Sequence, residues 1–497
     1  MEHKTVILPG TPNDDNRDYL PEAIKRSDMV VNENGNNSQP YPEKLIEYTD
    51  TVIDGVSDTW CEYVPASYDP SKKTPLVFSM HGGMMTGWGQ AIYTSWTMVA
   101  DREGFIVVFP NAHQRRFWLI EVDKDKIEEA TTPREDGIYL NRPPEKVDDN
   151  HDIRLVLALL ERMKEKYTID TGRVFMQGMS MGNVMTAQFA RHFGNVLAGA
   201  AGSGGPSSLT LLFDEDDKVI NRGGPLAIWQ TRLERDGVPP HYGKSTREVV
   251  ARNRDYWRIV NGSTALPEIK IVGEDNLAFF KGEHGDVVFR DVKNRDHGQT
   301  LDDAELVWDY LFSGTRRNED GSIEYTKPLA AREGDPFSIA IADGCDKAWV
   351  NNRVADIGSP VFAWRKLKYH GQNGNALIRG EYLCAPLSFI ARLFDAKLEA
   401  SEDTFSAVMT LKDGRTLQFA RGSIGCVVDG RIQSMLCEAV HANGGLNISL
   451  EWLCLSVLGL WASTCENVLY VTDHFSRISL NMAQLIEDIL TGKYPNA

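Results

Sequence analysis

The sequence predicts an α/β fold with a doubly wound, mostly parallel sheet, followed by a smaller C-terminal α+β domain. Short apolar runs of strand length alternate with amphipathic, helix-length segments as far as residue 312. A polar linker rich in Gly, Asn and Asp follows at 313–322. Beyond this linker the strands are shorter, and a strand–helix pattern occurs twice. Two domains of different architecture are therefore expected.

The elements of the first domain follow from hydrophobic spacing. Its strands are short apolar or β-branched runs, and its helices carry apolar residues three and four positions apart. The expected strands are 59–64, 74–80, 105–109, 173–177, 196–201, 226–230 and 269–272. The expected helices are 88–102, 152–167, 183–193 and 301–312. Strands that alternate with helices in this way are typical of parallel pairs joined by crossover connections.

The chain is expected to divide into three parts, since 497 residues exceed one ordinary domain. Residues 1–45 are polar and irregular, 46–314 form the α/β domain, and 323–497 form the C-terminal domain.

The C-terminal domain contains a weak internal repeat. Residues 380–391 and 445–454 each predict a strand, a turn and a short apolar helix. Between these copies, the turn Asp413-Gly414 predicts a hairpin that joins 407–411 to 416–420.

Composition limits the partners and the compartment. The formal net charge of −17 argues against nucleic acid and anionic membranes, since both are polyanions. No stretch approaches the ~20 apolar residues of a membrane span. No secretion signal is visible, so we expect a cytoplasmic location, or a secreted or cell-surface one if a leader has been removed.

The seven cysteines predict free thiols in a reducing compartment. They include no C-x-x-C pair, and six lie beyond residue 340, where one or two disulfides are the alternative. We expect no metal site and no cofactor, because zinc ligands usually come in closely spaced pairs.

The most informative motif is Gly178-Met179-Ser180-Met181-Gly182. It follows the expected strand 173–177 and precedes the expected helix 183–193, so it has the strand–turn–helix context of the nucleophile elbow of α/β-hydrolases. Glycines are needed there because a Cβ would collide with the neighbouring helix or strand. Ser180 is therefore the expected nucleophile.

A serine nucleophile needs a base, and in this fold the base is a late histidine. His297 lies in a loop directly before the expected closing helix 301–312, which is the usual place for this residue. His284 is the second choice. The orienting carboxylate is expected in the loop after the strand 226–230, where Asp236 is preferred and Glu234 is the alternative.

The oxyanion of acyl transfer needs two backbone N–H donors. Met181, directly after the nucleophile, and Gly83, in the His81-Gly82-Gly83 loop after the strand 74–80, are the expected donors. In this loop His81 is expected to have a structural role. Three tryptophans are expected as walls of the substrate pocket: Trp88, Trp118 and Trp229.

Together these motifs resemble the polyhydroxybutyrate depolymerase-type esterases, which include feruloyl and acetylxylan esterases. The resemblance covers about residues 60–312 and lies in 75–83, 104–110, 167–174 and the elbow. It implies Ser180 as nucleophile, His297 as base and Asp236 as acid.

This chain departs from the esterase pattern at three positions. Leu233 replaces a glycine before the acid, Met181 replaces a small residue, and Asn183 replaces the second glycine of a pair.

The C-terminal region resembles the copper amine oxidase N-terminal-like domain. The resemblance lies in residues 385–391 and, more loosely, 448–454. It implies no copper site.

The resulting functional hypothesis is a serine carboxylesterase that acts on aryl (feruloyl-like), acetyl or hydroxyalkanoate esters, either small or linked to a polymer. A serine peptidase of the same fold is one alternative. The other is a non-catalytic binding protein that acts through the C-terminal domain, which could also mediate homo-oligomer formation.

Overall fold

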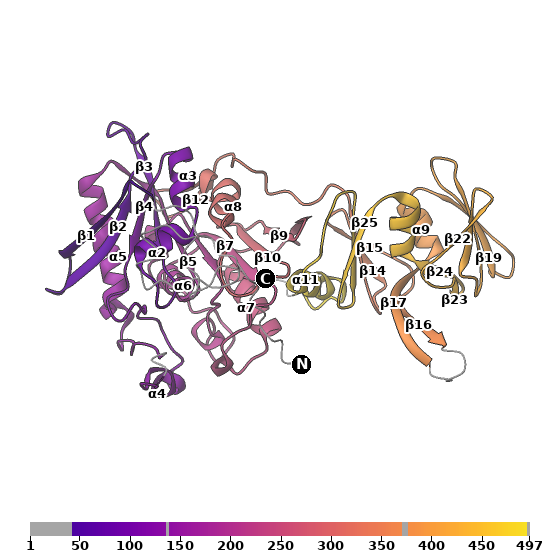
Figure 1. The fold of residues 1–497 in the computed structure, drawn as a ribbon, viewed down its shortest axis with the longest axis horizontal. Coiled ribbons are helices and arrows are strands. Elements are labelled where there is room, and N and C mark those ends of the chain that lie inside the picture. The colour runs from indigo at the N-terminus through magenta and orange to yellow at the C-terminus, as the bar shows by residue number, and fades with distance from the viewer. Residues whose placement is uncertain (1–41, 136–138, 370–375, 495–497) are drawn as a thin grey trace, which may run out of the picture. The chain divides into compact units, whose positions relative to one another are not determined.

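The computed structural model describes residues 42–135, 139–369 and 376–494 (Figure 1). The chain forms two compact units. The first contains residues up to Ala265 together with Phe279–Arg332, and the second contains Leu266–Ala278 together with the chain from Glu333 onward. Among the described residues, no helix is both long and apolar enough to cross a membrane.

The first unit is built on a mixed sheet with a parallel centre. Its strands lie in the order β1-β2-β4-β3-β5-β6-β7-β10. The β1–β2 and β2–β4 pairs are antiparallel, and every pair from β4 to β10 is parallel. The strands are β1 (Leu45–Thr51), β2 (Ser57–Tyr63), β3 (Thr74–Met80), β4 (Ile106–Pro110), β5 (Ile169–Met179), β6 (Gly199–Ser203), β7 (Ala227–Leu233) and β10 (Val287–Val292). This sheet fits the predicted α/β-hydrolase class.

The central strands are buried, and most of their residues are apolar. Every residue of β3, β4 and β10 is buried, as expected for parallel strands covered on both faces. The helices of this unit are α2 (Gly87–Tyr93), α3 (Trp96–Glu103), α4 (Ile127–Thr131), α5 (His151–Lys166), α6 (Met181–Phe193), α7 (Thr246–Val260) and α8 (Asp303–Tyr310).

Some predicted boundaries were wrong. The single helix expected at 88–102 is two helices, because Thr94 has extended backbone angles that end α2 before Ser95 begins α3. The strand expected at 196–201 starts later, because Gly194–Val196 form a 3-10 turn before β6.

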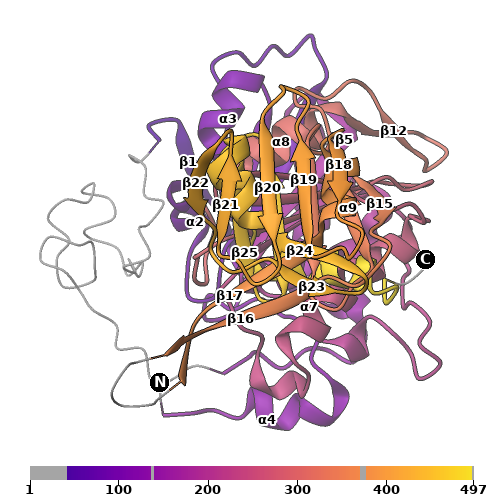
Figure 2. The same ribbon diagram turned by 90° about the vertical axis from the view of Figure 1, so that its right-hand side faces the viewer.

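The second unit consists mostly of antiparallel sheets, so the smaller second domain differs in architecture from the first, as expected. One sheet has the order β15-β14-β13-β26-β25 and another has the order β16-β17-β24-β23. A third runs β18-β19-β20-β21-β22, and its strands lie side by side in Figure 2. The expected hairpin is present as β19 (Ser406–Thr410) and β20 (Thr416–Ala420).

The remaining strands of these sheets are short, apart from β16 and β17. They are β13 (Ser338–Ala342), β14 (Lys347–Val350), β15 (Arg353–Asp356), β16 (Phe362–Tyr369), β17 (Ala376–Pro386), β18 (Lys397–Ala400), β21 (Gly425–Val428), β22 (Arg431–Ser434), β23 (Val440–Ala442), β24 (Gly445–Ser449), β25 (Trp461–Cys465) and β26 (Val468–Thr472). The segment Leu266–Ala278 adds β8 (Glu268–Val272) and most of β9 (Asp275–Phe280) to this unit.

The two copies of the predicted repeat pair with each other. The first copy is β17 followed by α9 (Leu387–Leu393), and the second is β24 followed by α10 (Leu450–Trp452). The strands β17 and β24 are antiparallel, with Cys384 opposite Ser449 and Ala385 opposite Ile448. The apolar residues of both helices lie in one core. The two strand–helix copies therefore contribute to the same hydrophobic core.

Candidate active site

The turn between β5 and α6 has the geometry of a nucleophile elbow. Ser180 has φ 56° and ψ −120°, a conformation that non-glycine residues rarely adopt. A Cβ on Gly178 would overlap the carbonyl oxygen of Gly182, and a Cβ on Gly182 would overlap that of Met80. The predicted reason for both glycines is thereby confirmed.

Asn183 stands where the esterase pattern has the second glycine of a pair, and its side chain makes specific contacts in the turn. Its amide Nδ2 donates to the carbonyl oxygens of Gly204 and Gly205. The side chain fills the space where Gly202 lacks a Cβ. The asparagine thus anchors the start of α6 to the loop that follows β6.

Three loops bring Ser180, His297 and Asp236 together. The strands β5, β7 and β10 are parallel, so the segments after their carboxyl ends meet at one edge of the sheet. Ser180 Oγ lies 2.8 Å from His297 Nε2, and His297 Nδ1 lies 3.1 Å from Asp236 Oδ1. The His297 side chain is 51% exposed and that of Asp236 is 10% exposed. The arrangement can pass a proton from a hydroxyl to an oriented imidazole.

The structure distinguishes Asp236 from Glu234. The Glu234 carboxylate is buried and accepts hydrogen bonds from the backbone N–H of Asn294 at 2.8 Å and from Lys293 Nζ at 3.2 Å. It therefore holds the start of the loop that carries His297 and does not contact the imidazole. His284, the second choice for the base, lies beside Glu283 and is not among the residues that line the cavity at Ser180.

A buried arginine supports Asp236 and was not anticipated from the sequence. Arg232, in β7, donates from Nη2 to the carbonyl oxygen of Asp236 at 2.9 Å. Burial lowers the pKa of its guanidinium, while the Asp236 and Asp291 carboxylates counteract that shift. The signal in the sequence is a charged residue inside the short strand 227–233, where the other residues are uncharged.

The two expected oxyanion donors are available. Within the described part of the chain, the backbone N–H groups of Gly83 and Met181 have no hydrogen-bond acceptor. Met181 is the first residue of α6, where N–H groups point out of the helix toward an incoming negative charge. The pair can therefore receive an oxyanion near Ser180.

His81 fixes the loop that carries Gly83. Its Nε2 accepts the backbone N–H of Ala112 at 3.0 Å, so Nδ1 bears the proton and donates to the carbonyl oxygen of Gly82 at 2.6 Å. Burial lowers the pKa of His81 to about 4, so the ring is neutral at pH 7. These contacts agree with a structural role for His81.

A cavity of about 690 Å³ opens beside Ser180 and His297. Its lining is mainly apolar and includes Met84, Met85, Phe117, Met179, Met181, Val184 and Leu211. Polar residues in the lining include Glu121, Asp123, Ser208 and His241. The cavity is large enough for an aryl or long acyl group.

The predicted tryptophan walls were wrong, because none of the three lines this cavity. Trp118 is buried and donates from Nε1 to the His81 carbonyl oxygen at 2.7 Å. Trp229 is buried in β7 and donates to Thr231 Oγ1 at 2.8 Å. Trp88 is half-buried in α2. Trp118 and Trp229, whose indole N–H groups are hydrogen-bonded, pack in the core. Methionines line the cavity instead.

Comparisons with known proteins give a partial match. No protein-family model matches the chain. A stretch of 146 residues is 29% identical to the bifunctional acetylxylan esterase/xylanase XynS20E of Neocallimastix patriciarum, and it covers 29% of this chain but only 17% of that protein. This match supports the esterase part of the resemblance, whereas the copper amine oxidase resemblance stays a prediction.

Two solved structures are also similar to this chain. An acetyl xylan esterase from Aspergillus awamori has a TM-score of 0.39 at 15% identity, and the match covers 54% of this chain and 98% of that one. A CE1 ferulic acid esterase from Anaeromyces mucronatus has a TM-score of 0.33 at 15% identity, with 56% and 94% covered.

Proposed function

We propose that this protein is a serine carboxylic ester hydrolase. The observation that carries the proposal is the chain of contacts from Ser180 Oγ through the His297 imidazole to the Asp236 carboxylate, at 2.8 and 3.1 Å. The match to a protein named as an acetylxylan esterase/xylanase supports the same class of reaction. We also propose that residues 46–314 form the hydrolase domain and 323–497 a separate domain.

The proposed reaction has two halves. His297 Nε2 removes the proton from Ser180 as Oγ attacks the ester carbonyl carbon, and Asp236 stabilises the imidazolium. The N–H groups of Gly83 and Met181 stabilise the oxyanion. The imidazolium then protonates the leaving alcohol. In the second half, His297 activates a water molecule that releases the acid from Ser180.

The cavity supports an ester with a bulky, apolar acyl group. An acetyl group would leave most of the 690 Å³ filled only by water, whereas an aryl acyl group would bury apolar surface against the methionines and Phe117. We therefore propose feruloyl-like aryl esters ahead of acetyl and hydroxyalkanoate esters.

The test compares the wild type with Ser180→Ala on p-nitrophenyl acetate and methyl ferulate. We expect the variant to lose activity, because removal of a catalytic triad member typically costs about 10⁴- to 10⁶-fold in kcat. Ser71→Ala is the matched control, since Ser71 is exposed and does not line the cavity. Equal rates in Ser180→Ala and wild type would overturn the proposal.

Two further readouts separate the alternatives. Cleavage of a peptide library without turnover of esters would favour a serine peptidase. A fluorophosphonate probe that fails to label Ser180 would favour a non-catalytic binding protein.

A further inference from the structure

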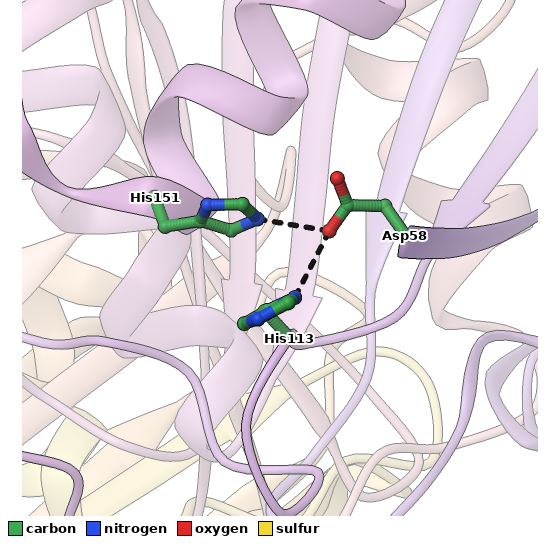
Figure 3. Close-up of side chains that lie close together, drawn as sticks. All are labelled: Asp58, His113 and His151. Atoms are coloured by element: carbon green, nitrogen blue, oxygen red, sulfur yellow. Dashed lines mark hydrogen bonds and ion pairs between the residues drawn. The ribbon is translucent and has the colours of Figure 1, made fainter. Parts of the chain in front are cut away.

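A second cluster of functional side chains lies outside the cavity at Ser180. Asp58 of β2, His113 after β4 and His151, the first residue of α5, point toward one another (Figure 3). Asp58 Oδ1 lies 2.8 Å from His151 Nε2 and 3.1 Å from His113 Nδ1. All three atoms lie within 4.8 Å of one another. None of these residues lines the cavity.

The His151 ring lies between two carboxylates. Its Nδ1 lies 3.1 Å from Asp54 Oδ2, while its Nε2 faces Asp58 Oδ1. A neutral imidazole has one N–H and one lone pair, so it can donate to only one of these carboxylates. The other contact brings a lone pair toward a carboxylate oxygen. A metal ion bound by the two atoms would resolve this repulsion.

Asp54 can hold His151 in the tautomer that a metal ligand needs. Arg154 Nη1 donates to Asp54 Oδ2 at 3.0 Å, which fixes the carboxylate beside His151 Nδ1. A proton on Nδ1 then donates to Asp54 and leaves the Nε2 lone pair directed at the cluster. Histidines that bind metals commonly donate their other N–H to a carboxylate in this way.

The Asp58 carboxylate is a buried acceptor that is incompletely satisfied. Its side chain is fully buried. Oδ1 faces two imidazoles, and Oδ2 has no hydrogen-bond partner among the residues that the structure describes. A buried charge without full pairing costs free energy, and a bound cation would offset that cost.

The ligand set indicates the class of ion. Two imidazole nitrogens and one carboxylate oxygen suit Zn²⁺ or a similar divalent transition metal, whereas Ca²⁺ and Mg²⁺ prefer oxygen ligands. Tetrahedral zinc with bonds of about 2.0–2.2 Å places its ligand atoms about 3.3–3.6 Å apart. The contacts of Asp58 Oδ1 at 2.8 and 3.1 Å are shorter than this spacing, so the ligand atoms would move apart slightly to admit the ion. The His113 and His151 side chains are 24% and 13% exposed, so water can complete the coordination.

We propose that Asp58, His113 and His151 bind one Zn²⁺ or similar divalent transition-metal ion, with Asp54 as the outer partner of His151. This ion would tie together β2, the segment after β4 and the start of α5. It stabilises the fold and takes no part in ester chemistry, so the proposal stands independently of the function of Ser180.

The ion would also order one wall of the cavity. The backbone N–H of His113 donates to Asp152 Oδ1 at 3.1 Å, and that of Leu119 donates to Asp152 Oδ2 at 2.7 Å. The next residues along the chain, Ile120 and Val122, line the cavity. The metal cluster and the cavity wall therefore share one anchored segment.

The test uses the full chain after removal of metals with a chelator. We expect calorimetric titration with ZnCl₂ to give one ion per chain and the bound ion to raise Tm. His113→Gln and His151→Gln should bind at least tenfold more weakly. Asp54→Asn, which changes the partner of the outer nitrogen of His151 but no proposed ligand, should bind about 10- to 100-fold more weakly. His284→Gln is the matched control with an exposed histidine and should bind like wild type.

Two results would overturn the proposal. One is the absence of stoichiometric binding and of a Tm rise in wild type. The other is undiminished binding in both histidine variants. If these variants fail to fold, Co²⁺ titrated into wild type decides: the visible absorption of a four-coordinate nitrogen–oxygen site supports the proposal, and the spectrum of the aqueous ion contradicts it.

Discussion

Arg232 Nη1 lies 3.5 Å from Asp236 Oδ2, whereas the other carboxylate oxygen, Oδ1, pairs with His297. Both side chains are buried, at 5% and 10% exposure. The same guanidinium donates to the backbone carbonyl of Asp236. The guanidinium thus contacts both the side chain and the backbone of this residue, and its position limits where the carboxylate can present Oδ1 to the imidazole.

Replacing Arg232 should impair catalysis through geometry. Arg232→Met keeps much of the side-chain volume but removes the contacts to Asp236, and displacement of a catalytic group by about 1 Å can cost about 100-fold. We expect a lower kcat with a nearly unchanged KM, measured on p-nitrophenyl acetate. Arg235→Met is the control, since Arg235 is largely exposed. Wild-type kcat in Arg232→Met would show that the loop holds Asp236 without this arginine.

The two carboxylates after β7 should differ sharply in their effects on rate. Asp236→Asn removes the negative charge that stabilises the imidazolium and allows an amide N–H to hold the wrong tautomer of His297, so it should lower kcat by about 10⁴-fold. Glu234→Gln weakens the contact to Lys293 and should mainly lower Tm. Steady-state kinetics and thermal unfolding of both variants provide the test. A larger loss of kcat in Glu234→Gln would reverse the assignment.

The oxyanion role of Gly83 can be tested by removing its backbone N–H group. Gly83→Pro eliminates the backbone N–H and should lower kcat by about 10²- to 10³-fold. Gly83→Ala keeps the N–H, and its Cβ would meet only Phe117 and Met181 side-chain atoms at 3.4 and 3.5 Å. Similar kcat values in the two variants would exclude this donor.

His81 should make the protein lose stability in mild acid. Its folded pKa of about 4 lies below the ordinary 6.5, so between these values the unfolded chain binds more protons than the folded one. The free energy of unfolding therefore falls as pH drops from 6.5 to 4, by up to about 3 kcal/mol from this residue.

Denaturant unfolding across that range tests the acid effect. His81→Gln should flatten the slope, while His284→Gln should retain it. The Glu121 carboxylate also makes the free energy of unfolding depend on pH, but in a lower pH range. Burial would raise its pKa, but His192 and Arg191 hold it at about 2, so its stabilisation is lost only below about 4.5. If the free energy of unfolding of His81→Gln falls with pH as steeply as that of wild type, the loss of stability in acid comes from other groups.

Local sequence patterns were enough to predict the elbow, but they could not predict contacts between residues that are distant in the sequence. The glycines around Ser180 and the loop containing His297 are encoded within a few residues of sequence, so their positions could be read directly. Asp236 could not be separated from Glu234, because the distinction depends on Lys293 and Asn294, about 60 residues away. The strand β10 was missed although Val287-Val288-Phe289 is a short apolar run, because charged residues at 290 and 291 interrupt it.

The proposed metal ligands were even harder to predict from the sequence. Asp58, His113 and His151 come from segments separated by about 40 to 90 residues, and none of them lies in a short motif. Only the antiparallel pairing of β2 with β4 and the placement of α5 bring them together. Trp118 and Trp229 were likewise expected to line the pocket, but both are buried in the core.

The methionines around Ser180 have a consequence for the lifetime of the protein in an oxidising medium. Met84, Met85, Met179 and Met181 all line the cavity. Oxidation converts an apolar thioether into a polar sulfoxide, which would reshape the acyl side of the cavity beside the nucleophile. Dilute peroxide should therefore inactivate the protein before it unfolds, and reduction of the sulfoxides by methionine sulfoxide reductases should restore the activity. Redox conditions, and not only temperature or acidity, would then determine how long the protein remains active.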